Sequence, residues 1–235
     1  TNDLRALARE FGCTDVDQAE RNLQSILNLG LPDDLVVNLF QQLAKLLSQA
    51  TDSDRVLGNL ERFAHASLSP QSLLALFERE PESLGSLVQL FATSQYMADQ
   101  LIKDPVAFDL LRMTDGQPVQ ASLLADEILA EVNAATEVRQ TMRAIRGFRH
   151  RENLRIAYGD FIGGLPVEII TEQLSSLADA ILQAAVAAAA REMASKRDAP
   201  RRADGQRARF AVLALGKLGG AELNYSSDID LLMVC

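Results

Sequence analysis

Apolar residues recur at helical spacing through most of this chain. They stand three or four residues apart at Leu35, Leu39 and Leu43, and again at Leu84, Leu87, Val88 and Phe91. This spacing lines one side of a helix with side chains that can be buried. Aromatic residues make up only 5% of the chain and Trp is absent, whereas Ala and Leu are abundant. The pattern predicts a mainly α protein, an irregular helical bundle over residues 1–196 rather than a β-sandwich.

Proline and small polar residues indicate where these helices begin. Ser69 precedes Pro70 and Asp104 precedes Pro105, which is the order of an N-cap followed by the first helical turn. Thr14 with Asp17 resembles a loose capping box. Gly163, Gly164 and Pro166 are expected to separate a helix over residues 137–161 from a long helix over residues 167–196. The prolines are unequally spaced, so the sequence predicts no solenoid of fixed repeats.

The pattern changes after residue 196. Residues 197–208 combine Pro, Gly and charge without an apolar face and are expected to form a linker. The continuous apolar run from Phe210 to Leu215 that follows predicts a buried strand of an α/β sheet. We therefore expect a helical domain over 1–196, a linker over 197–208, and the first strands of a second domain over 209–235.

Charge is unevenly distributed along the chain, whose net charge is −9. Residues 1–138 carry 21 acidic and 9 basic side chains, whereas residues 139–210 carry 13 basic and 8 acidic ones. The overall acidity argues against nucleic acid as a partner. The basic segment includes six arginines on one predicted helix: Arg139, Arg143, Arg146, Arg149, Arg151 and Arg155. They could pair on the surface with Glu137, Glu152 and Asp160, or they could contact nucleotide phosphates or an acidic partner.

The two cysteines, Cys13 and Cys235, stand far apart without the spacing of a metal site or a disulfide framework. This usage fits a reducing compartment, and we expect a cytoplasmic protein. The longest stretch of low polarity, Ala184–Ala190, is too short to span a bilayer, and no signal peptide is visible. The sequence thus predicts no membrane partner.

The last twenty residues hold the pattern that points most directly to chemistry. Asp228 and Asp230 are two residues apart on a predicted strand, so their side chains share a face about 7 Å apart along the chain. Paired carboxylates of this kind can bind Mg²⁺ or Mn²⁺, which neutralise nucleotide phosphates during displacement reactions. Small and polar residues before them are expected to approach the phosphates through backbone amides, hydroxyls or charge: Gly216, Lys217, Gly219, Gly220, Ser226 and Ser227. For Lys217, a solvated turn residue is an equally good interpretation.

The stretch GKLGGAELNYSSDIDLL, residues 216–232, resembles the signature of the bifunctional glutamine synthetase adenylyltransferases, or adenylyl-removing enzymes. These enzymes belong to the DNA polymerase β-like nucleotidyltransferase superfamily. RGFRHRENLRIAYGDF, residues 146–161, resembles the Arg-rich helix before the family's catalytic domain. NLERF, residues 59–63, and LFATSQYMADQLIKDP, residues 90–105, are similar to its helical lead-in.

The resemblance implies an activity and a set of partners. ELNYSSDID and the lead-in look more like the amino-terminal half of the enzyme, which implies removal of AMP from a tyrosine of glutamine synthetase by phosphorolysis, giving ADP. Control by the PII signalling protein and glutamine, and use of ATP, ADP and phosphate, are implied as well. Asp228 and Asp230 match the family's metal-binding catalytic pair, and Gly219, Gly220 and Ser227 match its phosphate-side turn. The superfamily's third carboxylate is expected on a later strand that this chain lacks, so we expect an incomplete site without activity of its own.

Other interpretations remain open. A PII uridylyltransferase has a similar glycine turn and SDIDLL strand, although the KLGG wording and the long helical lead-in favour the adenylyltransferase. The helices could instead form a regulatory or docking module without activity. Histidine chemistry is not expected, because neither His65 nor His150 lies beside a Ser or Cys in a nucleophile motif.

Overall fold

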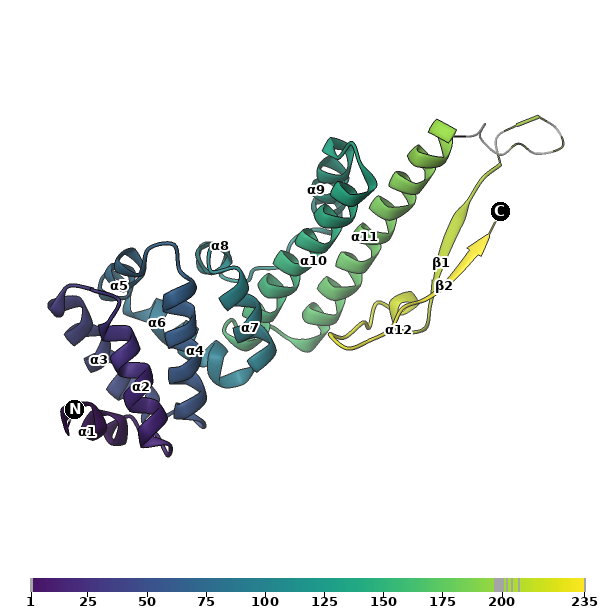
Figure 1. Ribbon diagram of the computed structural model, residues 1–235. Coiled ribbons are helices and arrows are strands. Elements are labelled where there is room, and N and C mark those ends of the chain that lie inside the picture. The colour runs from purple at the N-terminus through teal and green to yellow at the C-terminus, as the bar shows by residue number, and fades with distance from the viewer. Residues whose placement is uncertain (1, 197–200, 202, 204, 207, 235) are drawn as a thin grey trace. The chain divides into compact units, whose positions relative to one another are not determined.

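The described part of the protein is mainly α-helical, with one small sheet formed by residues 211–215 and 230–234 (Figure 1). The structure, a computed structural model, describes residues 2–196, 201, 203, 205–206 and 208–234. Its contacts divide the chain into unit 1, residues 1–115, and unit 2, residues 116–235. The helices predicted as one domain over 1–196 therefore belong to two units. The predicted domain boundary at 197–208 stays a prediction, because most of that segment lies outside the described residues.

Unit 1 is built from short helices around a core of phenylalanines. Phe63 meets Phe91 and Phe108 edge to face, with ring centroids 5.8 and 5.9 Å apart, a favourable geometry for buried aromatic rings. The described helices of this unit are α1 (Asn2–Glu10), α2 (Val16–Leu27), α3 (Asp33–Leu47), α4 (Ser53–Ala66), α5 (Pro70–Arg79), α6 (Pro81–Thr93), α7 (Gln95–Lys103) and α8 (Ala107–Thr114).

One predicted helix cap is confirmed and two are wrong. Ser69 caps α5 by accepting a hydrogen bond from the Ser72 amide, and Pro70 occupies the first turn. Asp104 instead ends α7, and α8 begins only at Ala107, after a turn that contains Pro105. An apolar residue, Val106, holds the N-cap position of α8 without a side-chain hydrogen bond.

The predicted capping box at Thr14 is wrong because Thr14 forms its hydrogen bonds with another helix. Its amide and its hydroxyl both donate to Asp54 of α4, at 2.8 and 2.6 Å, so Asp15 caps α2 in its place. Burial opposes ionisation of Asp54, but the hydrogen bonds from Thr14 and Asp15 outweigh it and lower the pKa of this carboxyl. Burial, together with the charge of Asp54, raises the pKa of the Cys13 thiol to about 11. These contacts tie α2 to α4.

Unit 2 begins with three packed helices, α9 (Ala121–Ala134), α10 (Val138–Phe161) and α11 (Val167–Lys196). The predicted bounds of the last two helices are confirmed, α10 starting one residue later, with Glu137 as its N-cap. Gly116 has a φ of +62°, and a side chain there would lie 2.3 Å from the Gly159 backbone nitrogen. The loop before α9 therefore lies directly on the backbone of α10.

A buried polar network joins the three helices. Arg155 donates to Glu152 at 2.8 Å, to the Gln117 carbonyl at 2.6 Å and to the Gln173 side chain at 2.9 Å. Gln173 in turn exchanges two hydrogen bonds with the backbone of Val119. Within this network the side chains of Arg155, Glu152 and Gln173 thus all have partners, as burial of charge requires.

The sheet consists of two antiparallel strands, β1 (Ala211–Leu215) and β2 (Asp230–Val234), with the short helix α12 (Gly216–Gly219) after β1. Ala214 pairs with Leu231 on the face that packs against the helical core of unit 2. The strand prediction is confirmed, but its burial is wrong: Leu213 and Leu215 are 49% and 48% exposed. Because Leu213 and Leu215 lie on the face opposite Ala214, their exposure shows that this other face of the sheet is open. Within the described residues each strand has a single neighbouring strand.

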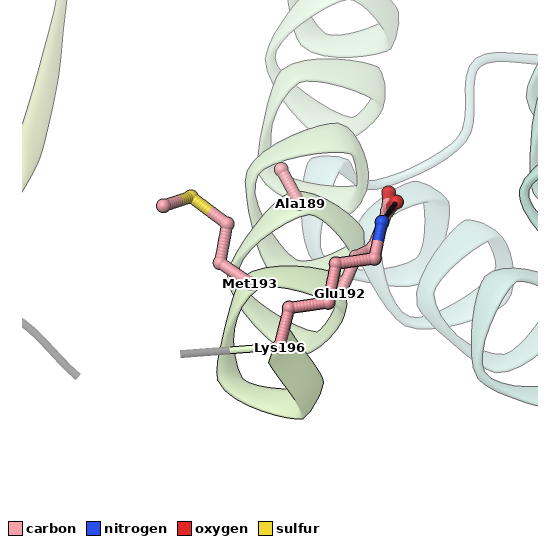
Figure 2. Close-up of a pocket in the computed structure, with 4 residues that line it drawn as sticks. All are labelled: Ala189, Glu192, Met193 and Lys196. Atoms are coloured by element: carbon pink, nitrogen blue, oxygen red, sulfur yellow. Dashed lines mark hydrogen bonds and ion pairs between the residues drawn. The ribbon is translucent and has the colours of Figure 1, made fainter. Parts of the chain in front are cut away.

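Among the described residues, α11 is long and apolar enough to cross a membrane by length and composition alone, in contrast to the expectation from Ala184–Ala190. One side of it, including Leu174, Leu177 and Ala180, is buried in the helical core. A helix in the core of a folded unit can have the same length and apolar composition as a membrane-spanning helix. The exposed end of α11 carries a shallow hollow lined by Ala189, Glu192, Met193 and Lys196, all from this one helix, with an ion pair of 2.6 Å between Glu192 and Lys196 (Figure 2).

Candidate functional site

The glycine turn after β1 is shaped by one left-handed backbone conformation and one close backbone contact. Gly216 has a φ of +56°, a conformation that side chains rarely adopt. A side chain at Gly219 would lie 2.6 Å from the carbonyl oxygen of Ala214 in β1. Between the two glycines, Leu218 is buried in the core formed by α9, α10 and α11. The turn is thus folded back on its own strand and anchored on the helices.

The structure brings Asp230 to this turn. Asp230 is the first residue of β2 and pairs with Leu215, the residue before Gly216. A side chain at Gly216 would lie 3.0 Å from the Asp230 carboxylate oxygen Oδ2. Because Leu231 packs on the helices, alternation along the strand places Asp230 on the open face of the sheet. Glycine at position 216 therefore leaves room for the carboxylate beside the turn.

Asp228 lies two residues before Asp230, in the extended segment that leads into β2, rather than within the strand as predicted. Both aspartates are exposed. In the part of the chain that the structure describes, no group of three or more His, Cys, Asp or Glu side chains gathers around a possible metal position. The structure therefore offers a pair of accessible carboxylates at one end of β2.

The segment before Asp228 is a compact turn closed by Asn224. The Asn224 side chain accepts hydrogen bonds from the Ser226 amide at 3.1 Å and from the Ser227 hydroxyl at 2.7 Å. The Ser227 amide donates to the Asn224 carbonyl. In this arrangement the Ser227 hydroxyl supports the turn. The role of Ser226 and Ser227 toward phosphate stays a prediction.

This turn is attached to two helices, α10 and α11. The Leu223 amide donates to Ser175 Oγ of α11 at 3.1 Å, and the Leu223 side chain is buried. Tyr225 donates from its hydroxyl to Asp160 of α10 at 3.1 Å, and its ring stacks on Phe161 with centroids 6.4 Å apart. Burial, with the charge of Asp160, raises the pKa of the Tyr225 hydroxyl. Sequence analysis missed these partners, because Asp160 is 65 residues away and no local pattern indicates the contact.

The remaining predicted residues of the turn are open to solvent. Lys217 is exposed, and its side chain makes no ion pair or hydrogen bond with the residues that the structure describes. Gly220 has ordinary space around it, because the nearest neighbours of a methyl group at that position would be 3.8 Å away. A phosphate contact at these two positions, or at Gly219, stays a prediction.

The six arginines of α10 fall into two groups. Arg155 lies in the buried network, and Arg151 pairs with Glu131 and Glu127 of α9. The other four are exposed, and no carboxylate of the described residues lies within 4.0 Å of them: Arg139, Arg143, Arg146 and Arg149. The interpretation that Glu152 and Asp160 pair with arginines on the surface is wrong, because Glu152 is buried with Arg155 and Asp160 accepts from Tyr225.

Unit 1 contains a Ser–His–Glu contact that the sequence did not indicate. Ser25 Oγ lies 2.8 Å from His65 Nε2 and donates to Glu61 at 2.6 Å. Glu61 also approaches His65 at Nε2, at 3.3 Å. In a hydrolase triad the acid orients the other ring nitrogen. This arrangement therefore lacks the geometry of a hydrolase triad.

Comparison with known proteins shows which family the chain resembles. A family model described as glutamate-ammonia ligase adenylyltransferase matches residues 84–235, which include the glycine turn and both aspartates. The bifunctional glutamine synthetase adenylyltransferase/adenylyl-removing enzyme of Neisseria meningitidis serogroup B is 36% identical over 206 residues, covering 84% of this chain and 21% of the relative. The protein of the same name from Chromobacterium violaceum is 31% identical over 237 residues, covering 99% of this chain and 25% of the relative.

A third relative of that name, from Pseudomonas putida, is 32% identical over 204 residues, covering 81% of this chain and 20% of the relative. The chain thus spans a fifth to a quarter of the length of these relatives. The family match includes the helices α9 to α11, the turn and the carboxylate pair. The chain belongs to the glutamate-ammonia ligase adenylyltransferase family.

Proposed function

We propose that this chain is part of an enzyme that moves AMP onto or off a tyrosine of glutamine synthetase. The observation that carries the proposal is the position of Asp230, whose carboxylate lies against the glycine turn inside the segment that matches the family. The names of the relatives supply the substrate, glutamine synthetase, and the two directions of transfer. The sequence resemblance favours the removal of AMP by phosphorolysis.

The carboxylate pair fits a divalent cation. Asp228 and Asp230 offer hard oxygen ligands, both are exposed, and Gly216 leaves free the space that a side chain would take beside Asp230. We therefore assign these two residues to Mg²⁺, or to Mn²⁺. When bound, such an ion would neutralise charge on the phosphates of ATP or ADP.

The residues of the chain would divide the remaining tasks. Gly216, Gly219 and Gly220 carry no side chains, so that the backbone at these three positions could come close to a phosphate. Lys217, on the turn, and Ser226, on the loop that follows it, are both exposed and would supply a cation and a hydroxyl. The proposal extends to regulation by the PII protein and glutamine and to a cytoplasmic location.

The comparisons support the adenylyltransferase over the uridylyltransferase, because the family match and the relatives carry the former name. A docking role for the helices is a second candidate. The exposed arginines of α10 without carboxylate partners among the described residues favour it. It would accompany catalysis in the longer protein.

The test uses the full-length enzyme with adenylylated glutamine synthetase, Mg²⁺ and phosphate, and measures ADP. Asp228→Asn and Asp230→Asn should each abolish turnover and leave the circular dichroism spectrum unchanged, because both side chains are exposed. Asp126→Asn, at an exposed position on α9, is the matched control and should keep full activity. Unchanged ADP formation in either variant would contradict the assigned roles, and loss of helical signal would show that the pair is structural.

A further inference from the structure

Asp228, the first of the two predicted catalytic residues, lies on a segment with little regular structure of its own. Residues 220–229 connect α12 to β2 and carry Gly220, Ser226, Ser227 and Asp228. Catalytic groups must be held within about half an ångström of their working geometry. The sheet supports this segment only at its end, where β2 begins at Asp230. Within the described residues β2 pairs with β1 alone. The rest of its support has to come from the helices.

The helices provide that support at two points. At Leu223 the segment is held by the hydrogen bond to Ser175 and by burial of the leucine side chain. At Tyr225 it is held by the hydrogen bond to Asp160 and by the ring of Phe161. These two points lie on α11 and at the last turn of α10, and they fix the segment on either side of Asn224.

Tyr225 is close in sequence to Asp228, and the hydrogen-bonded Asn224 turn connects the two residues. Tyr225 stands three residues before Asp228, and the Asn224 turn ties the residues between them together. A hydrogen bond to an ionised acceptor is stronger than one between neutral groups. A tyrosine hydroxyl ordinarily titrates near pH 10 and is therefore protonated, and able to donate, across the physiological range; burial raises the pKa of Tyr225 further. A displacement of Tyr225 would thus be passed on to the first carboxylate of the pair.

We propose that Asp160 and Tyr225 are positioning residues: their hydrogen bond fastens the Asn224 turn to the end of α10 and so sets where Asp228 stands relative to Asp230. The proposal rests on the proposed function, since it assigns a task within the same site. It predicts that the contact governs metal use and turnover more than it governs the stability of the fold. Neither residue needs to touch the substrate.

The experiment compares variants of the full-length enzyme. Tyr225→Phe removes the hydroxyl and keeps the ring against Phe161, whereas Asp160→Ala removes the acceptor. In each, the rate of ADP formation should fall about tenfold, since small displacements of reacting groups are costly, and the Mg²⁺ concentration for half-maximal activity should rise severalfold. Asp160→Asn keeps an acceptor and should retain more activity. The double variant Tyr225→Phe/Asp160→Ala should be no worse than either single variant, because both changes break one contact.

Tyr96→Phe is the control: Tyr96 is 63% exposed in unit 1 and should tolerate the loss of its hydroxyl. Wild-type Mg²⁺ dependence and rate in Tyr225→Phe would overturn the proposal. So would effects of Tyr225→Phe and Asp160→Ala that simply multiply in the double variant. A rate loss matched by a large fall in melting temperature, with unchanged Mg²⁺ dependence, would show a structural contact instead.

Hydrogen exchange separates this proposal from the function on which it rests. If the wild-type enzyme moves no AMP under any condition, the proposed function fails. The amides of Leu223, Ser226 and Ser227 should still exchange faster in Tyr225→Phe than in wild type or in Tyr96→Phe, because their turn has lost its attachment. Unchanged exchange over residues 223–228 would refute the attachment itself, whatever the activity.

Discussion

Replacing Arg155 by methionine should cost this protein a large part of its stability. The Arg155 side chain is 4% exposed and its partner Glu152 is 11% exposed, so the ion pair lies within the core of unit 2. Methionine keeps most of the volume but removes three hydrogen bonds, to Glu152, Gln117 and Gln173. Glu152 would remain buried without its cation. Breaking a buried pair in this way costs about 3–5 kcal/mol.

Urea unfolding followed by circular dichroism of the helices measures this cost, since the protein has no Trp for fluorescence. Arg143→Met is the matched control, because Arg143 is exposed on the same helix and should change stability by less than about 0.5 kcal/mol. The double variant Glu152→Leu/Arg155→Met should lose less than Arg155→Met alone, since no charge is then left unpaired. A loss below about 1 kcal/mol in Arg155→Met would refute the importance of the network.

Three further outcomes are expected. Gly219→Ala should destabilise the protein by about 1–3 kcal/mol in thermal unfolding, because its methyl group would meet the Ala214 carbonyl at 2.6 Å, whereas Gly220→Ala should be tolerated. The folded-state pKa of Asp54 lies below its ordinary value of 3.8, so its contribution to stability is present above about pH 4 and is lost as the pH falls through the lowered pKa; acid unfolding should be shallower in Asp54→Asn. The 235-residue chain alone should form no ADP from adenylylated glutamine synthetase while the full-length enzyme does, and equal rates would contradict the expectation of an incomplete site.

Local patterns predicted the elements of this fold well. Gly163, Gly164 and Pro166 marked the break between α10 and α11, because their backbone requirements exclude a continuous helix. Ser69 was identified as a cap because its hydrogen bond to Ser72 is made within one turn. In both cases the interaction that decides the structure lies within a few residues of sequence.

Contacts between distant segments could not be predicted in the same way. Thr14 does not cap its own helix because Asp54, 40 residues later, takes its hydrogen bonds. The apolar run ending at Leu215 forms a strand as expected, yet half-exposed, because burial depends on which layers cover the sheet. The site shows the same division: the order of glycines and aspartates is visible in the sequence, whereas the attachment of Tyr225 to Asp160 is not.

The burial of Leu218 and Leu223 in the helical core also bears on the order in which the parts of unit 2 fold during synthesis. A growing chain leaves the ribosome from its N-terminus, so α9, α10 and α11 are available before either leucine is. Their shared core lacks both leucines until residue 218 has emerged, and it still lacks Leu223 until residue 223 follows. The pairing of β1 with β2 joins residues that are close in sequence and closes quickly once both are present. We therefore expect the turn that carries the aspartates to fold after α9, α10 and α11, onto a helical surface that already presents Ser175 and Asp160.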